Sequence, residues 1–184
     1  HLNGANGLRK GRQKGAESYI SSPNFSLRAE YFGLRGFSVG LSGYFGKTQS
    51  KLADGLNKDN IAAVAQYDSS RVAINMIGVD AKYSIKGMHL RGQFYYNSLG
   101  NTGQYNLFTS DAGISNDLGS EMIGYYFEAA YNVFSSAEAI ESELLPFIRY
   151  EYYDTHHAVD NTISIHDQFQ KKIITAGLTL KLTS

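Results

Sequence analysis

The chain has 184 residues, with 17 basic and 17 acidic side chains and no cysteine. The balanced charge argues against a nucleic-acid partner, and the lack of cysteine excludes disulfides, a thiol nucleophile and a zinc site built on cysteine. The mean hydropathy is −0.30, and no run approaches the roughly 18 apolar residues of a membrane-spanning helix. The length fits one domain.

Seven amphipathic segments follow one another along the chain. Each alternates large apolar side chains with polar ones, as where Ile77 and Val79 alternate with Gly78 and Asp80. Because neighbouring side chains on a strand point to opposite faces, each segment predicts a strand with one apolar and one polar face. The predicted strands are 24–33, 37–47, 71–85, 88–98, 120–133, 144–154 and 169–182.

The links between these strands differ in length in a regular way. The pair Lys86-Gly87 predicts a two-residue hairpin, because glycine adopts the positive φ that this turn requires. The links are short at 34–36 and 86–87, medium at 134–143, and long at 48–70, 99–119 and 155–168. A meander with such unlike ends is typical of an antiparallel barrel set across a bacterial outer membrane, with short periplasmic turns and longer extracellular loops.

We therefore predict an all-β fold, an antiparallel up-and-down transmembrane β-barrel. Seven strands are too few to close a single-chain barrel of even strand number, and the last strand still alternates at 178–182. We expect the chain to be a fragment of a larger barrel. It would form one domain over 1–184, with an extracellular loop at 1–23 and strands and loops over 24–182. Tyrosines near the strand ends favour an aromatic girdle, although tyrosine is also a good strand former.

The polar face of the predicted strands contains charges of both signs, and we take this face as the lining of the barrel. Two readings remain open: a ladder of cross-strand ion pairs that braces a watery lumen, which we favour for each single residue, or rings of charge that filter ions. The pore-lining candidates on the strands are Arg28, Glu30, Asp80, Lys82, Arg91, Glu128, Arg149, Glu151 and Lys181.

A second group of candidates is the basic segment that contains Arg9, Lys10, Arg12 and Lys14. Four cations within six residues could fold into a pore and attract anions, or bind lipopolysaccharide phosphates. The alternative is a solvated surface loop, which charge runs usually are.

Other constellations give weak signals. His156, His157 and Asp160, with His166 and Asp167, lie in one predicted loop but match no metal-binding motif, so surface polar residues are the favoured reading. The segment 54–60 is rich in oxygen ligands but fails the EF-hand pattern. No nucleophile elbow is present. We expect no enzymatic activity, no metal site and no cofactor.

The segments 24–47, 80–96 and 144–154 resemble the C-terminal half of bacterial outer-membrane porins of the porin O and P type, a phosphate-selective porin-like family. The resemblance implies a barrel of about 16–18 strands, often trimeric, that passes small solutes down their gradient. Family members selective for phosphate use arginine and lysine in the pore. The mixed charges here mean that phosphate selectivity is not carried over.

The expected function is therefore a passive diffusion channel for small hydrophilic solutes or ions in the outer membrane of a Gram-negative bacterium. The expected partners are outer-membrane lipid, lipopolysaccharide, small solutes and further copies of the chain, as a trimer or within a larger membrane complex. An alternative is a non-conducting barrel that serves as a scaffold or adhesin through its long loops. A third class is a soluble β-sandwich, which would stay in solution without detergent.

Overall fold

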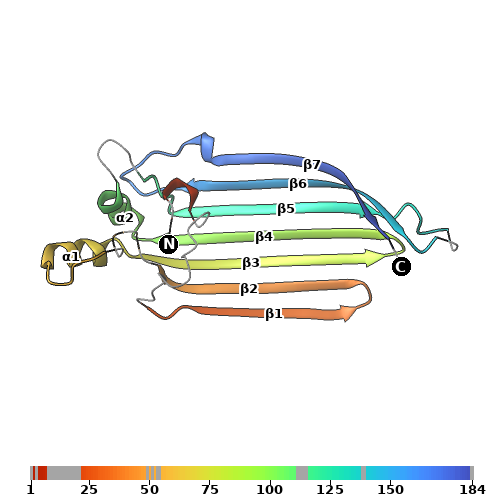
Figure 1. Cartoon of the computed structure of the whole chain (residues 1–184), viewed down its shortest axis with the longest axis horizontal. Helices are drawn as coiled ribbons and strands as arrows, with labels where there is room; N and C mark the ends of the chain where they lie inside the picture. The colour runs from red at the N-terminus through yellow and green to blue at the C-terminus, as the bar shows by residue number, and fades with distance from the viewer. Residues whose placement is uncertain are drawn as a thin grey trace.

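The protein is a single seven-stranded antiparallel sheet, seen here in a computed structural model (Figure 1). The strands lie in chain order, from β1 to β7, and each pairs with the next. Their bounds are β1 Phe25–Leu34, β2 Phe37–Thr48, β3 Val72–Ile85, β4 Met88–Gly100, β5 Glu121–Tyr131, β6 Glu143–Ala158 and β7 Gln170–Lys181. The structure describes residues 2, 4–7, 22–48, 50, 52, 55–110, 116–137 and 140–182.

The two ends of the sheet differ in the way the sequence predicts. At one end the turns at residues 35–36 and 86–87 join β1 to β2 and β3 to β4. Lys86 and Gly87 both have positive φ, 46° and 80°, which is the backbone of a type I′ hairpin turn and matches the right-handed twist of the strands. At the other end, the longer links project together from the sheet (Figure 1). The prediction of seven antiparallel strands with unlike ends is confirmed.

Two short helices lie within the long links, so the fold is mostly β rather than all-β. Helix α1 is Ile61–Ser69 and helix α2 is Thr102–Thr109. Asn60 caps α1, because its side chain accepts a hydrogen bond of 3.1 Å from the backbone N–H of Ala63. Alternation with a period of two does not detect such helices, so the predicted all-β fold is corrected to a mostly β fold. Among the described residues, no helix is long and apolar enough to span a bilayer.

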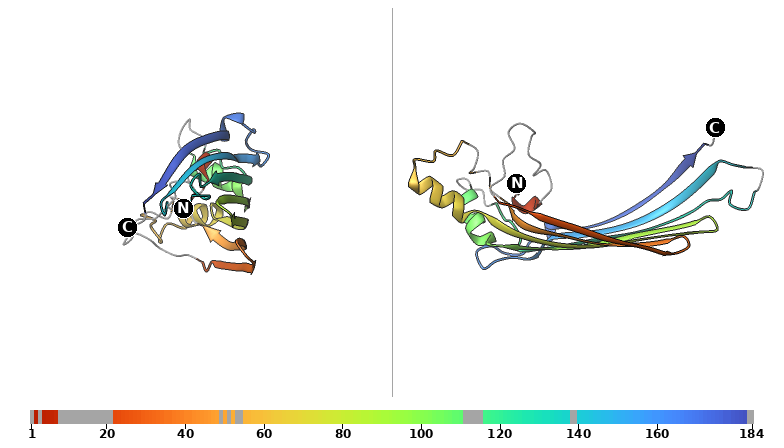
Figure 2. Two further views of the ribbon diagram at one scale, coloured as in Figure 1. Left: turned by 90° about the vertical axis from the view of Figure 1, so that its right-hand side faces the viewer. Right: turned by 90° about the horizontal axis from the view of Figure 1, so that it is seen from below.

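The sheet is strongly curved but open, and it does not close into a barrel within the described chain (Figure 2). The edges of the sheet are formed by β1 and β7. The 3-10 helix Gly4–Asn6 lies on the concave side, near the long links (Figure 2). Among the described residues, Thr155 Oγ1 donates a hydrogen bond to Ala5 O at 2.9 Å, and the Tyr105 hydroxyl donates one to Leu2 O at 3.2 Å, and both attach this N-terminal segment.

The buried core is small and lies at the long-link end of the sheet. Leu2, near the N-terminus, and Tyr105, in helix α2, pack there against strand residues. The other buried hydrophobic members are Val72, Ile74, Leu99, Leu118 and Met122. Elsewhere the sheet is one layer thick, because among the described elements no helix or second sheet packs across its middle.

Candidate functional site

The two faces of the sheet differ in chemistry, as the alternation predicts. On the convex face the side chains are aliphatic and aromatic and stay exposed, for example 40% for Val79 and 72% for Ile174. Further members of this apolar face are Phe25, Leu27, Leu41, Phe94, Tyr125, Phe127, Ile148 and Leu178. The cross-strand register places them together, since Leu41 pairs with Val79, and Val79 pairs with Phe94. A continuous exposed apolar surface of this kind marks a contact with lipid or with another protein.

The opposite, concave face holds the charged residues that the sequence marks as pore-lining candidates. The register brings them into neighbouring rows: Lys82 pairs with Arg91, Arg91 with Glu128, and Glu128 with Arg149. The next row of the sheet contains Asp80 on β3 and Glu151 on β6. Glu30 on β1 belongs to the same row, because Gly40 on β2 pairs with both Glu30 and Asp80. The basic candidates Arg9, Lys10, Arg12 and Lys14 lie outside the described residues.

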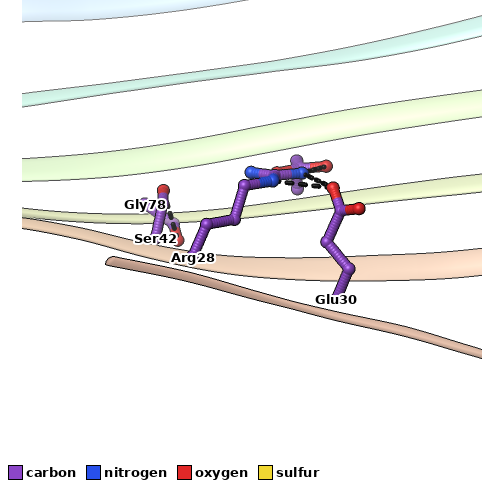
Figure 3. A network of polar contacts seen from close by, with 5 residues as sticks. Arg28, Glu30, Ser42 and Gly78 are labelled. Atoms are coloured by element: carbon purple, nitrogen blue, oxygen red, sulfur yellow. Dashed lines mark hydrogen bonds and ion pairs between the residues drawn. The ribbon is translucent and has the colours of Figure 1, made fainter. Parts of the chain in front are cut away.

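Arg28 forms the first ion-pair cluster, which joins β1 to β3 across the intervening strand (Figure 3). Its Nη1 and Nη2 donate to the two carboxylate oxygens of Asp80 at 2.7 and 3.1 Å, and its Nε donates to Glu30 Oε1 at 2.7 Å. The guanidinium passes over Gly40, where a Cβ atom would lie 2.5 Å from Arg28 Nη2. Glycine at position 40 therefore leaves the space in which a bidentate arginine–carboxylate pair forms.

Glu128 is the centre of the second cluster, which joins β4, β5 and β6. Arg91 Nε donates to Glu128 Oε1 at 2.8 Å, and Arg149 Nε donates to Glu128 Oε2 at 2.8 Å. Glu128 is only 4% exposed, because the two guanidinium groups cover its carboxylate. Arg149 also lies 4.8 Å above the ring of Tyr126, a cation–π contact, and 3.7 Å from Glu151 Oε1.

The remaining two candidates differ in their surroundings. Lys181 donates to Glu143 Oε2 at 2.6 Å, an exposed pair near the short turns. Lys82 is exposed and forms no ion pair within the part of the chain that the structure describes. Both lysines line a cavity of about 590 Å³, together with His89, Arg91, Arg149 and Glu128. Basic side chains outnumber acidic ones in this cavity, so its field favours anions.

The sequence identified most of the charged wall but missed some of its partners. Glu143 was left out because the predicted sixth strand began at 144, one residue too late; extending the alternation by one residue would have included it. Tyr126 lies on the polar face of β5, and its contact with Arg149 depends on the register between β5 and β6. The paired clusters favour the reading of a structural ion-pair ladder for Arg28 and Glu128.

Two of the three histidines in the predicted loop 155–168 lie in a strand instead, while His166 lies in the link as predicted. β6 extends to Ala158, so His156 and His157 belong to a strand and not to the predicted loop 155–168. His156 is buried, and its Nε2 lies 2.6 Å from the carbonyl oxygen of Asp117. Its ring packs against Phe169 with the centroids 4.2 Å apart and the planes tilted by 43°. Within the described ranges no three histidine, aspartate or glutamate side chains are arranged to hold a metal ion.

Asp160 joins the last long link to α2. Its carboxylate accepts hydrogen bonds from the Thr162 backbone N–H at 2.7 Å, from the Thr162 hydroxyl, and from Thr102 Oγ1 at 3.0 Å. Partial burial raises the pKa of Asp160, but the hydrogen bonds from Thr162, Thr102 and Asn106 outweigh it, so its pKa lies below the usual aspartate value. Asp160 therefore has a structural role, since it connects the link between β6 and β7 to the link that contains α2.

Comparisons of the chain with protein-family models, with curated proteins and with solved structures find no match.

Proposed function

We propose that this chain forms part of the wall of a bacterial outer-membrane channel of the porin type, through which small hydrophilic solutes or ions diffuse passively. The observation that supports this most directly is the opposition of the two faces of one sheet. The convex face exposes aliphatic and aromatic side chains, while the concave face contains two ion-pair clusters and a cationic cavity. Transmembrane barrels have this same division, with the apolar face toward lipid and the polar face toward the lumen.

The dimensions of the sheet agree with this proposal. The strands contain 10 to 16 residues, and a tilted membrane strand needs about 9–11. The two-residue turns lie at one end and the long links at the other, which fits the periplasmic and extracellular ends of such a channel. A water-filled lumen needs more than eight strands, so the proposed channel includes strands additional to these seven, with a trimer as the expected assembly.

Selectivity in the proposed channel comes from pore width and lining charge. Because Arg28 and Glu128 are locked in ion pairs, their charges largely cancel at long range. Lys82 forms none of the described ion pairs, and it lines the 590 Å³ cavity in which basic side chains outnumber acidic ones. The proposed channel therefore favours small anions modestly and excludes no class of ion by charge alone.

The test is conduction by the full-length protein in a planar lipid bilayer. We expect stepwise increases in current, with ion flux that depends on the salt gradient. A protein that inserts into the membrane but produces no current steps would contradict the channel and support the alternative, a scaffold or adhesin that acts through its long links. A protein that stays in solution without detergent would contradict both.

Two neighbouring residues of β4 provide a matched test of which face meets lipid. Phe94 lies on the convex face and is 41% exposed, whereas Gln93 lies on the concave face. Arginine on the lipid face near the midplane costs about 2–4 kcal/mol, so Phe94→Arg should reduce insertion into liposomes strongly. Gln93→Arg should insert as the unmodified protein does. Equal insertion of the two variants would contradict the assignment of the faces.

A further inference from the structure

A large cavity lies on the concave face, on the long-link side of the charged rows. Its volume is about 1040 Å³, slightly above the roughly 300–1,000 Å³ typical of small-molecule sites. The strands β2, β4 and β6 contribute Tyr44, Tyr95 and Tyr153, and Phe169 follows from the last long link. The N-terminal segment closes one side through Ala5.

The ring of Tyr95 lies flat against the backbone of the neighbouring strand β5. Tyr95 and Tyr153 lie on either side of Gly124 in the cross-strand register. A Cβ atom at Gly124 would lie 2.3 Å from Tyr95 Cζ, so glycine at this position allows the Tyr95 ring to lie across β5. The ring remains 37% exposed. A flat, partly exposed aromatic face, held in place by backbone, is a ready stacking surface.

The polar side chains around this cavity are mostly neutral and have free hydrogen-bonding groups. Gln93, Gln168 and the hydroxyls of the three tyrosines form no hydrogen bond with the part of the chain that the structure describes. Asn97, which is buried, also lines the cavity, and its Oδ1 accepts no hydrogen bond there. The accessible amides and hydroxyls gain direct partners from a ligand that has several hydroxyls, because such a ligand replaces the water that otherwise bonds to them.

The charges in the cavity cancel. Its lining includes one cation, Lys171, and one anion, Asp154, whereas cations dominate the 590 Å³ cavity near the short turns. An anionic ligand would therefore be held better at the second cavity, and a purely apolar ligand would leave the amides and hydroxyls of the first unpaired. A neutral solute with apolar faces and hydroxyl edges can contact the aromatic rings of the lining with its faces and can hydrogen-bond to the amides and hydroxyls with its edges.

We propose that this cavity is a binding site for a neutral, polyhydroxylated solute of the size of a short oligosaccharide. The rings of Tyr95 and Tyr153 stack on the C–H faces of the sugar rings, and Gln93 and Gln168 hydrogen-bond to its hydroxyls. The site would hold a solute on its way through the lumen, so the inference rests on the proposed channel and names one class of solute for it.

The test measures binding and conduction separately, with maltotriose as the probe. Titration calorimetry on the full-length protein in detergent should detect maltotriose binding, and the current through single channels should show transient blocks when maltotriose is added. Poly(ethylene glycol) of the same mass, which is neutral but lacks sugar faces and internal hydroxyls, should bind too weakly to detect. If the polymer and the sugar block equally, the cavity only restricts size and the inference is overturned.

Two tyrosines with nearly equal exposure provide matched variants. Tyr95→Ala should weaken maltotriose binding by about tenfold or more, since it removes a stacking ring. Tyr125→Ala changes a residue of the adjacent strand that is 39% exposed on the convex face, and should leave binding unchanged. Tyr95→Phe keeps the ring and should lose less affinity than Tyr95→Ala.

The two proposals fail in different ways. A protein that conducts but binds no maltotriose, or in which Tyr95→Ala and Tyr125→Ala bind equally, overturns the sugar site and keeps the channel. A protein that binds maltotriose with the expected dependence on Tyr95 but conducts nothing keeps the site and contradicts the channel.

Discussion

The two halves of the concave face have the same strand alternation but different chemistry. Near the short turns, ion pairs around Glu128 cross the face, and no described helix lies over it (Figure 2). Near the long links, the face is neutral and aromatic around Tyr95, and the N-terminal segment and α2 cover part of it. Strand alternation decides which face of the sheet a side chain occupies. On the concave face, the side chains are apolar or aromatic where the N-terminal segment and α2 pack over the strands, and charged where they do not.

The largest expected effect is a loss of stability when the buried core at the long-link end of the sheet is disrupted. Leu118 is fully buried in the core there. Leu118→Ala should lower the free energy of unfolding by about 3 kcal/mol, because it leaves a cavity among packed side chains. Urea unfolding in detergent micelles measures this loss. Leu107→Ala, in the same region but 66% exposed on α2, is the control and should cost less than about 0.5 kcal/mol. An equal loss in both variants would contradict a packed core at this end.

A smaller effect tests the charged half. Glu128→Gln leaves two arginines without their anionic partner, and we expect a loss of about 2 kcal/mol, between the values for exposed and buried ion pairs. Because one negative charge is removed from the lining, the reversal potential in a salt gradient should also shift toward anions. Glu151→Gln, whose closest contact to Arg149 is 3.7 Å, is the matched control. A larger change in Glu151→Gln than in Glu128→Gln would show that the central ion pair is misassigned.

The smallest effect concerns the pH dependence of the long links. Because the pKa of Asp160 is lowered in the folded protein, its stabilising contribution is complete above the unfolded value of about pH 4 and is lost as the pH falls through the folded pKa. Hydrogen exchange in α2 should therefore be constant between pH 7 and pH 5, after correction for the intrinsic rate, and increase below about pH 4.

The control for this effect is Asp160→Asn, which removes the ionisable group. In this variant the corrected exchange of α2 should no longer change as the pH is lowered, although its level at pH 7 should be somewhat higher. The same acid-induced change in Asp160→Asn and in the unmodified protein would assign the effect to another group.

The sequence by itself determined the strands and their faces. The period of two placed all nine charged strand candidates, from Arg28 to Lys181, on one face, and Lys86-Gly87 identified a tight turn. These features depend on the local backbone, in which neighbouring side chains point in opposite directions whatever the rest of the chain does. The two short helices and the end of β6 at Ala158 were missed. Local sequence signals in the long links are weak, and tertiary contacts decide the secondary structure there.

Only the tertiary structure decided which residues meet. The pairing of Arg28 with Asp80 across Gly40, and of Glu128 with both Arg91 and Arg149, depends on the register between strands. The aromatic cavity depends on the same register, since Gly124 must lie beside Tyr95 for the ring to lie flat. A sequence pattern defines each strand separately, whereas contacts across strands follow from the packing of many residues at once, and a shift by one residue would change every one of them.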